Sequence, residues 1–213
     1  PEHPVVAHQD ALLYLGSKDL PDESGVAGVD PEPVVEDRVG KLGSAPELDL
    51  LDAARLAGIA VPERAEYIRV AVTELNRISS HLVWWGAYLL DLGAFTPVMY
   101  AFDDREQILD ILQAVTGSRL TYSYFTIGGV YDDVPTDFRE RCIGFVKRMR
   151  LRLPMYRDLV TNNVILRGRC EGIGELSVDT ARRYGATGPV LRGSGVASDV
   201  RKSEPYSVYD RFD

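Results

Sequence analysis

One carboxylate stands in an otherwise apolar stretch of the sequence. Asp91 lies within Leu-Leu-Asp-Leu-Gly-Ala at positions 89–94, and Trp84 and Tyr88 precede it at helical spacing, so the three share one helix face. A carboxyl group enclosed by apolar side chains is a candidate proton donor. A carboxylate that caps the next turn at a helix end would give the same pattern, so both interpretations stay open.

A second group of ionisable residues precedes Asp91 on the same expected helix. Glu74, Arg77 and His81 stand at i, i+3 and i+7, which places an acid, a base and an imidazole on one face. Ion pairs of this kind are a common structural device inside helical bundles. A functional pocket would use the same residue types, so the sequence leaves the choice open.

The cysteines and histidines argue against a metal held by this chain. Cys142 and Cys170 form no CxxC motif, so no thiolate metal site or iron–sulfur cluster is expected from this chain alone. The three histidines show neither HExxH nor paired helical spacing, which argues against a zinc hydrolase. The glycine-rich stretch at 192–195 lacks the spacing of a phosphate-binding loop, and we expect it to allow close backbone packing.

The segment 139–169 is strongly basic, with nine basic and two acidic side chains. Such a run is compatible with binding to nucleic acid, to an acidic lipid surface or to a protein. Only four of the 24 basic residues of the chain are lysine, and arginine is the basic residue enriched at protein interfaces. The composition therefore favours a protein partner.

Several helices must position these residues. The strongest signal begins at Pro62, where apolar residues recur at helical spacing and Glu63 and Glu66 complement the helix N-terminus, and it ends before Gly93. The acidic pair at 103–104 reads as the start of a second helix. The expected elements are helices at about 48–56, 62–92, 105–115, 135–162 (with Pro154 as a kink or break) and 177–184, and a β-prone turn at 121–130.

The 213 residues divide into two parts of different charge. Residues 1–61 carry 12 acidic and 4 basic side chains and hold the whole formal net charge of −8, with one short helix expected in an irregular segment. Residues 62–213 are balanced and form the expected helical core. Hydrophobic content of 45% and charged content of 26% are typical of globular proteins. No membrane span and no signal peptide are expected, and the cysteine usage suits a reducing compartment.

Four strings together resemble one family: VPERAEYIRVAVTELNRISSHLVWWGAYLLDLGAFTP, YAFDDREQILDILQAVTGSRL, YFTIGGV and ATGPVLRGSGVASDVRKSEPYSVYD. The protein resembles the quinone-site subunit of NADH:quinone oxidoreductase, respiratory complex I, which is related to the large subunit of [NiFe] hydrogenases. The resemblance implies a mainly α-helical bundle with small β or irregular excursions. Hydrogenase activity is not implied, because the paired CxxC motifs that hold nickel and iron are absent.

The resemblance also implies a function within an assembly. The chain would help form a site for menaquinone or ubiquinone at the interface with a small subunit that carries the terminal [4Fe–4S] cluster, and would couple electron transfer to proton translocation. NAD and the iron–sulfur clusters would bind to partner subunits only. The resemblance implies a location in the peripheral arm, on the cytoplasmic face of the inner membrane. It implies no membrane span in this chain and no binding to nucleic acid.

The site residues implied by the resemblance are four. Asp91 matches the aspartate of the LDxGAxTP motif, which takes part in coupling protonation to quinone reduction, and His3 matches the quinone-site histidine of an N-terminal HP motif. Arg119 keeps its family position near the cluster and could favour the reduced cluster, while Thr121 replaces a histidine found in many relatives. Residues 9–47 depart from the family pattern. Two alternatives remain: a scaffold of the same fold that lost the site, and a helical nucleic-acid-binding domain.

Overall fold

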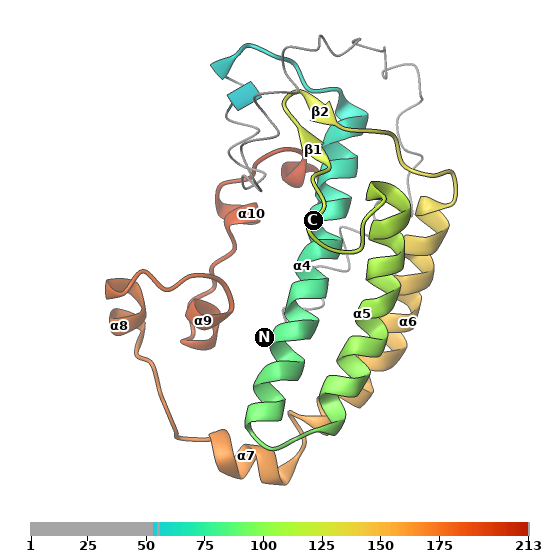
Figure 1. Cartoon of the computed structure of the whole chain (residues 1–213). Helices are drawn as coiled ribbons and strands as arrows, with labels where there is room; N and C mark the ends of the chain where they lie inside the picture. The colour runs from blue at the N-terminus through green and yellow to red at the C-terminus, as the bar shows by residue number, and fades with distance from the viewer. Residues whose placement is uncertain (1–52, 55, 213) are drawn as a thin grey trace.

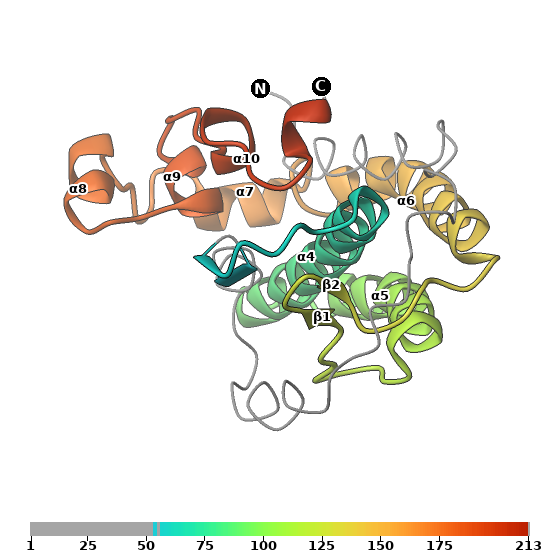
Figure 2. The ribbon, with the colours of Figure 1, turned by 90° about the horizontal axis from the view of Figure 1, so that it is seen from above.

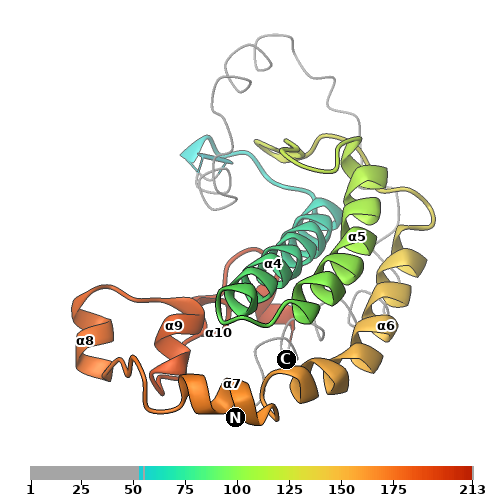
Figure 3. The ribbon, with the colours of Figure 1, turned by 60° about the horizontal axis from the view of Figure 1, so that its bottom comes forward.

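The computed structural model describes residues 53, 54 and 56–212, and three long helices form its centre. They are α4 (Glu63–Asp91), α5 (Thr96–Thr116) and α6 (Phe138–Leu159), with α5 packed between the other two (Figures 1 and 3). The predicted mainly α-helical fold class is confirmed. Most of the predicted acidic segment 1–61 lies outside the described residues, but positions 53, 54 and 56 are helical and Gly58 follows with φ of +66°.

Helix α4 begins and ends where its sequence predicts. Pro62 precedes its first turn, which contains Glu63 and Glu66. At the other end Gly93 adopts φ of +84° and donates to the carbonyl of Leu90 at 2.9 Å, while Ala94 donates to that of Leu89 at 2.8 Å. This pair of hydrogen bonds is a Schellman motif, in which glycine supplies the left-handed conformation that closes the helix.

Helix α5 begins earlier than the sequence predicts. The acidic pair at 103–104 is not a helix start, since the helix already begins at Thr96 with a proline in its first turn. The two carboxylates instead face α6, where Arg148 and Arg152 bind both of them. The predicted end is confirmed, because Gly117 closes the helix at φ of +77°.

The contact between α5 and α6 contains a fully buried carboxylate. Asp104 accepts from Arg148 Nε at 2.8 Å and Arg152 Nε at 3.1 Å, and the hydroxyl of Tyr156 also donates to it. Tyr156 also belongs to the apolar core, to which all three helices contribute. The core includes Ile68, Val72, Leu75, Ile78, Leu82, Ile108, Leu112, Phe145, Val146 and Met149.

A two-stranded hairpin covers the first half of α4. Strand β1 (Phe125–Thr126) pairs antiparallel with β2 (Gly129–Val130), as the β-prone turn at 121–130 predicts. The buried guanidinium of Arg69 on α4 donates to the carbonyl of Gly129 at 3.0 Å and to that of Thr126. Because a buried guanidinium needs acceptors, these two carbonyls hold the hairpin on the helix.

The C-terminal third extends away from the three helices and then returns. It contains α7 (Val164–Cys170), α8 (Val178–Arg183), α9 (Gly188–Gly193), α10 (Val200–Ser203) and the 3-10 turn η2 (Tyr209–Arg211). Figures 2 and 3 show α8 and α9 projecting to one side. Ser177 caps α8 as predicted, accepting from the amide of Thr180 at 3.2 Å. Pro154 lies inside α6, which continues through it to Leu159.

No helix among the described residues combines the length and the hydropathy needed to cross a membrane. Over the same residues, no group of three or more histidine, cysteine, aspartate or glutamate side chains is arranged to hold a metal ion.

The two cysteines should differ strongly in reactivity. Cys142 is buried in the core, and burial raises the pKa of its thiol to about 12, whereas Cys170 is exposed. Because the thiolate is the reactive species, alkylation of Cys142 in the native chain should be at least about a hundredfold slower than that of Cys170. Mass spectrometry of iodoacetamide-labelled peptides measures this, and labelling in urea should make the two equal. Equal rates in the native chain would contradict the packing around α6.

Candidate functional site

Asp91 is exposed at the end of α4, which corrects the expectation of a semi-buried acid. Leu82, Gly86 and Leu89 form the buried face of this part of the helix. A Cβ added at Gly86 would lie 3.2 Å from Val98, so α5 packs closely on that side. Asp91 lies on the opposite side of the helix. Its apolar neighbours in the sequence do not enclose it, because they are distributed over both faces.

The open face of α4 beside Asp91 is aromatic. Trp84 and Tyr88 are 55% and 50% exposed, and their rings stack with centroids 6.1 Å apart. Arg77 and His81 continue the same stripe toward the middle of the helix. The carboxylate of Asp91 has no hydrogen-bond or ion-pair partner among residues 53, 54 and 56–212. Within that part of the chain, nothing competes with a ligand or a partner for this carboxylate.

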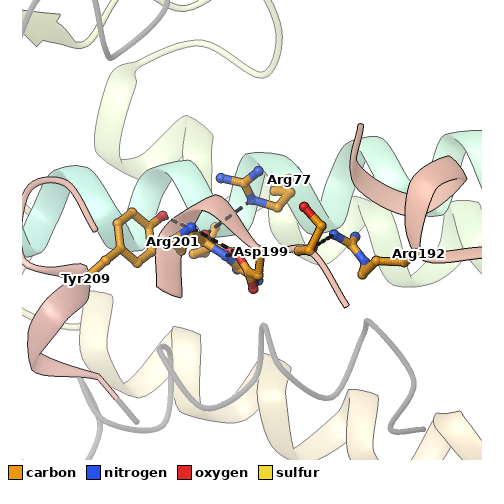
Figure 4. A network of polar contacts seen from close by, with 7 residues as sticks. Arg77, Arg192, Asp199, Arg201 and Tyr209 are labelled. Carbon is orange, nitrogen blue, oxygen red and sulfur yellow. Dashed lines mark hydrogen bonds and ion pairs between the residues drawn. The ribbon is translucent and has the colours of Figure 1, made fainter. Parts of the chain in front are cut away.

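A buried network joins α4 to the C-terminal segment (Figure 4). Glu74 is fully buried, and Arg77 Nε lies 3.2 Å from it, so the predicted pairing of these two residues is confirmed. Arg201 reaches the two carboxylate oxygens of Glu74 at 3.3 and 3.2 Å, and the hydroxyl of Tyr209 donates to Glu74 at 2.6 Å. Three donors therefore compensate one buried charge.

A second carboxylate extends this network. Asp199 accepts from Arg201 at 2.9 and 2.7 Å, and these hydrogen bonds hold the pKa of Asp199 below its usual range. The pKa of Tyr209 is raised, first by burial and then by the neighbouring Glu74. Arg192 donates to the carbonyl of Ser198 at 3.0 Å. The expected close backbone packing at 192–195 is wrong, because a Cβ added at Gly193 or Gly195 would have no described atom within 4 Å.

Arg119 and Thr121 belong neither to the surroundings of Asp91 nor to the network around Glu74. Arg119 pairs with Asp110 at 2.6 Å and with Glu106, both on α5, so it neither caps that helix nor offers an uncompensated charge. Thr121 is exposed, adopts φ of +53° and donates to the carbonyl of Leu120 at 2.7 Å.

The structure does not bring Asp91 together with Thr121. The hydroxyl of Tyr122, the next residue along the chain, donates to Asn76 on α4 at 2.9 Å. Asn76 and Asp91 are about 22 Å apart along the helix at about 1.5 Å per residue. His3, the fourth predicted site residue, lies outside the described residues.

The comparison with known proteins shows which family has this sequence. Residues 91–213 match the family described as respiratory-chain NADH dehydrogenase, 49 Kd subunit. The chain belongs to this family. The matched span begins at Asp91 and includes α5, α6 and the whole C-terminal segment of the network. The resemblance seen in the sequence is confirmed.

Bacterial relatives in the 49 Kd family are closely similar to this protein. The NADH-quinone oxidoreductase D subunit 2 of Opitutus terrae is 67% identical over 154 residues, which cover 72% of this chain and 39% of that protein. The D subunit of Desulfotalea psychrophila is 59% identical over 164 residues, covering 77% and 44%. The chain thus spans about two fifths of the length of these curated relatives.

A solved structure shares the fold of this 49 Kd family member. It is a chain of the membrane-bound sulfane sulfur reductase, an archaeal respiratory membrane complex. The TM-score is 0.69 at 37% sequence identity, and the match covers 73% of this chain and 42% of that chain.

In this member of the 49 Kd family, many arginines of the basic segment are engaged within the chain. Arg148 and Arg152 bind the carboxylates of α5. Arg141 pairs with Asp137 at 2.6 Å, and Arg167 pairs with Glu171 at 2.6 Å. The segment is therefore not a continuous basic face, which argues against nucleic-acid binding because that requires clustered uncompensated cations.

Sequence reasoning missed the partners of Glu74. It predicted the pair with Arg77, which is three residues away, but not Arg201 or Tyr209, which are 127 and 135 residues away. It also missed the buried role of Asp104, because two adjacent acidic residues resemble a helix start. No local pattern identifies contacts of such separation.

Proposed function

We propose that this chain contributes part of the quinone-reduction site of an NADH:quinone oxidoreductase. Membership of the 49 Kd subunit family supports the reaction, and the names of the bacterial relatives support the assembly. The observation that carries the site is the exposed carboxylate of Asp91, which has no partner among the described residues. It stands at the start of the matched span, beside the stacked rings of Trp84 and Tyr88.

The role proposed for Asp91 is proton transfer. Reduction of a quinone to a quinol consumes two electrons and two protons, so the site needs an acid close to the quinone oxygens. The carboxylate of Asp91 is open to a ligand, because no described residue forms an ion pair with it. It can also orient a neighbouring imidazole, and we propose His3 as that imidazole and as a quinone-binding residue.

The electron donor is proposed to be NADH, and the electrons would arrive through the terminal [4Fe–4S] cluster of a small partner subunit. NAD and all iron–sulfur clusters would belong to partner subunits, and the quinone, menaquinone or ubiquinone, would bind at the interface. The energy of reduction would drive proton translocation elsewhere in the complex. The chain would lie in the peripheral arm at the cytoplasmic face of the inner membrane.

Arg119 and Thr121 are proposed to lie near that cluster and not at the quinone. Since threonine does not titrate near neutral pH, reduction of the cluster should not be coupled to protonation at this position. We expect a low midpoint potential, as suits menaquinone, that stays constant between about pH 6 and about pH 8 in the assembled complex. Potentiometric titration followed by electron paramagnetic resonance measures it, and Thr121→His should introduce a pH dependence. A slope already present in the wild-type complex would contradict this prediction.

The proposed function is tested by assembly and by activity. The chain is expressed with a tagged small subunit from the same source, and complex formation is measured by co-purification. Membranes lacking the chain should lose NADH:quinone reduction, and its return should restore it. If the complex needs the chain to assemble but reduces quinone at the wild-type rate with Asp91→Asn, the alternative of a scaffold is favoured.

A further inference from the structure

Helix α4 ends with an unfavourable charge. The C-terminus of a helix carries a partial negative charge, and basic side chains in the last turn normally compensate it. The last turn of α4 has no basic residue, and its final residue is Asp91. A cation from another part of the chain would compensate this charge.

Arg169 supplies that cation from α7, 77 residues further along than Leu92. Its Nη1 donates to the carbonyl of Leu92, the residue that follows Asp91. The same nitrogen would lie 2.9 Å from a Cβ added at Gly93. Glycine is favoured at position 93 because its backbone has φ of +84°, and the absence of a side chain leaves space for the guanidinium.

Local contacts hold α7 in place for this interaction. The side chain of Asn163 accepts from the amides of Ile165 and Leu166 at 3.0 and 3.3 Å and caps the helix. Leu166 is the buried residue of α7. Figure 1 shows α7 beside the end of α4, where the chain turns into α5.

We infer that Arg169 is a positioning residue for Asp91. By binding the Leu92 carbonyl it fixes the turn that follows Asp91, and its positive charge stands at the helix end that bears the carboxylate. This inference rests on the proposed function, because it assigns to Arg169 an effect on the reaction that Asp91 serves. Arg169 would touch neither the quinone nor the cluster.

The test measures kcat and KM for quinone in the assembled oxidoreductase, with the content of each subunit determined for every variant. Arg169→Gln should lower kcat about three- to tenfold, because it releases the turn that orients Asp91, and should leave KM within about twofold. Arg169→Lys should recover at least half of the wild-type kcat, because its ammonium group can still donate to the Leu92 carbonyl. Arg167→Gln is the matched control, since Arg167 lies on the same helix and pairs with Glu171, and it should change neither value.

Asp91→Asn separates failure of this inference from failure of the proposed function. If Asp91→Asn is inactive and Arg169→Gln has wild-type kcat, Arg169 has no positioning role while the proposed site stands. If Asp91→Asn keeps full activity, the proposed site itself is wrong. In the double variant, Arg169→Gln should add no further loss to that of Asp91→Asn.

Loss of assembly in Arg169→Gln would not end the test. Lysine keeps the charge but lacks the planar fork of the guanidinium, so an assembled Arg169→Lys complex still reports on the charge. Arg169→Met, which is neutral and of similar length, is then measured in place of Arg169→Gln. A kcat lowered at least about threefold at equal subunit content supports the inference, and a wild-type kcat overturns it.

Discussion

Replacing Asp91 by asparagine is expected to lower the rate of quinone reduction at least about a hundredfold, the usual range for loss of a general acid. Asparagine has nearly the shape of aspartate but cannot carry a proton. The fold should be unaffected, because Asp91 is exposed and has no partner among the described residues. The measurement is the rate of NADH:quinone reduction at equal complex content.

Two comparisons make this result specific. Reduction of an artificial acceptor by the NADH-oxidising part of the complex should be unchanged in Asp91→Asn. Asp158→Asn is the matched control, since Asp158 is an exposed carboxylate on α6 that accepts a hydrogen bond from Asn162 at 2.7 Å. A loss of similar size in Asp158→Asn, or full quinone reduction in Asp91→Asn, would remove the proton-transfer role.

Removal of the Glu74 carboxylate should have the largest effect on stability. Glu74→Ala takes from Arg77, Arg201 and the hydroxyl of Tyr209 the buried acceptor that they share. Breaking a buried ion pair by removing one partner costs about 3–5 kcal/mol. We expect the free energy of unfolding in urea to fall by about that amount, and protease cleavage to begin in the released segment 196–212.

Controls on the same chain show whether burial causes this effect. Arg119→Ala removes an exposed pair with Asp110 and Glu106 and should leave the free energy of unfolding almost unchanged, because solvent screens exposed ion pairs. Tyr209→Phe removes one hydrogen bond to Glu74 and should cost about 1–3 kcal/mol. If Glu74→Ala were as mild as Arg119→Ala, the network would not hold the C-terminal segment.

The sequence predicts the long helices well where their signals are local. Helix α4 has apolar residues at a regular period, acidic residues in its first turn and Gly93 after its end, and each signal acts over a few residues. The sequence predicts the start of α5 several residues too late, because Asp103 and Asp104 resemble a helix N-terminus and their true partners lie on α6.

The candidate site is less predictable for the same reason. Its residue types can be found from the sequence, but the exposure of Asp91 depends on which face of α4 receives α5. The partners of Glu74 depend on a segment that returns after more than a hundred residues. Long-range pairing of this kind has no period and no local motif that a single sequence could display.

The return of the C-terminal segment has a consequence for synthesis on the ribosome. Val70 and Glu74 of α4 are fully buried, and their cover includes Val208, Tyr209 and Arg201. At about 5–20 residues per second, those covering residues are made roughly 7–30 s after the helix they protect. During that time the nascent chain exposes one face of α4, so a chaperone has a defined interval in which to bind it.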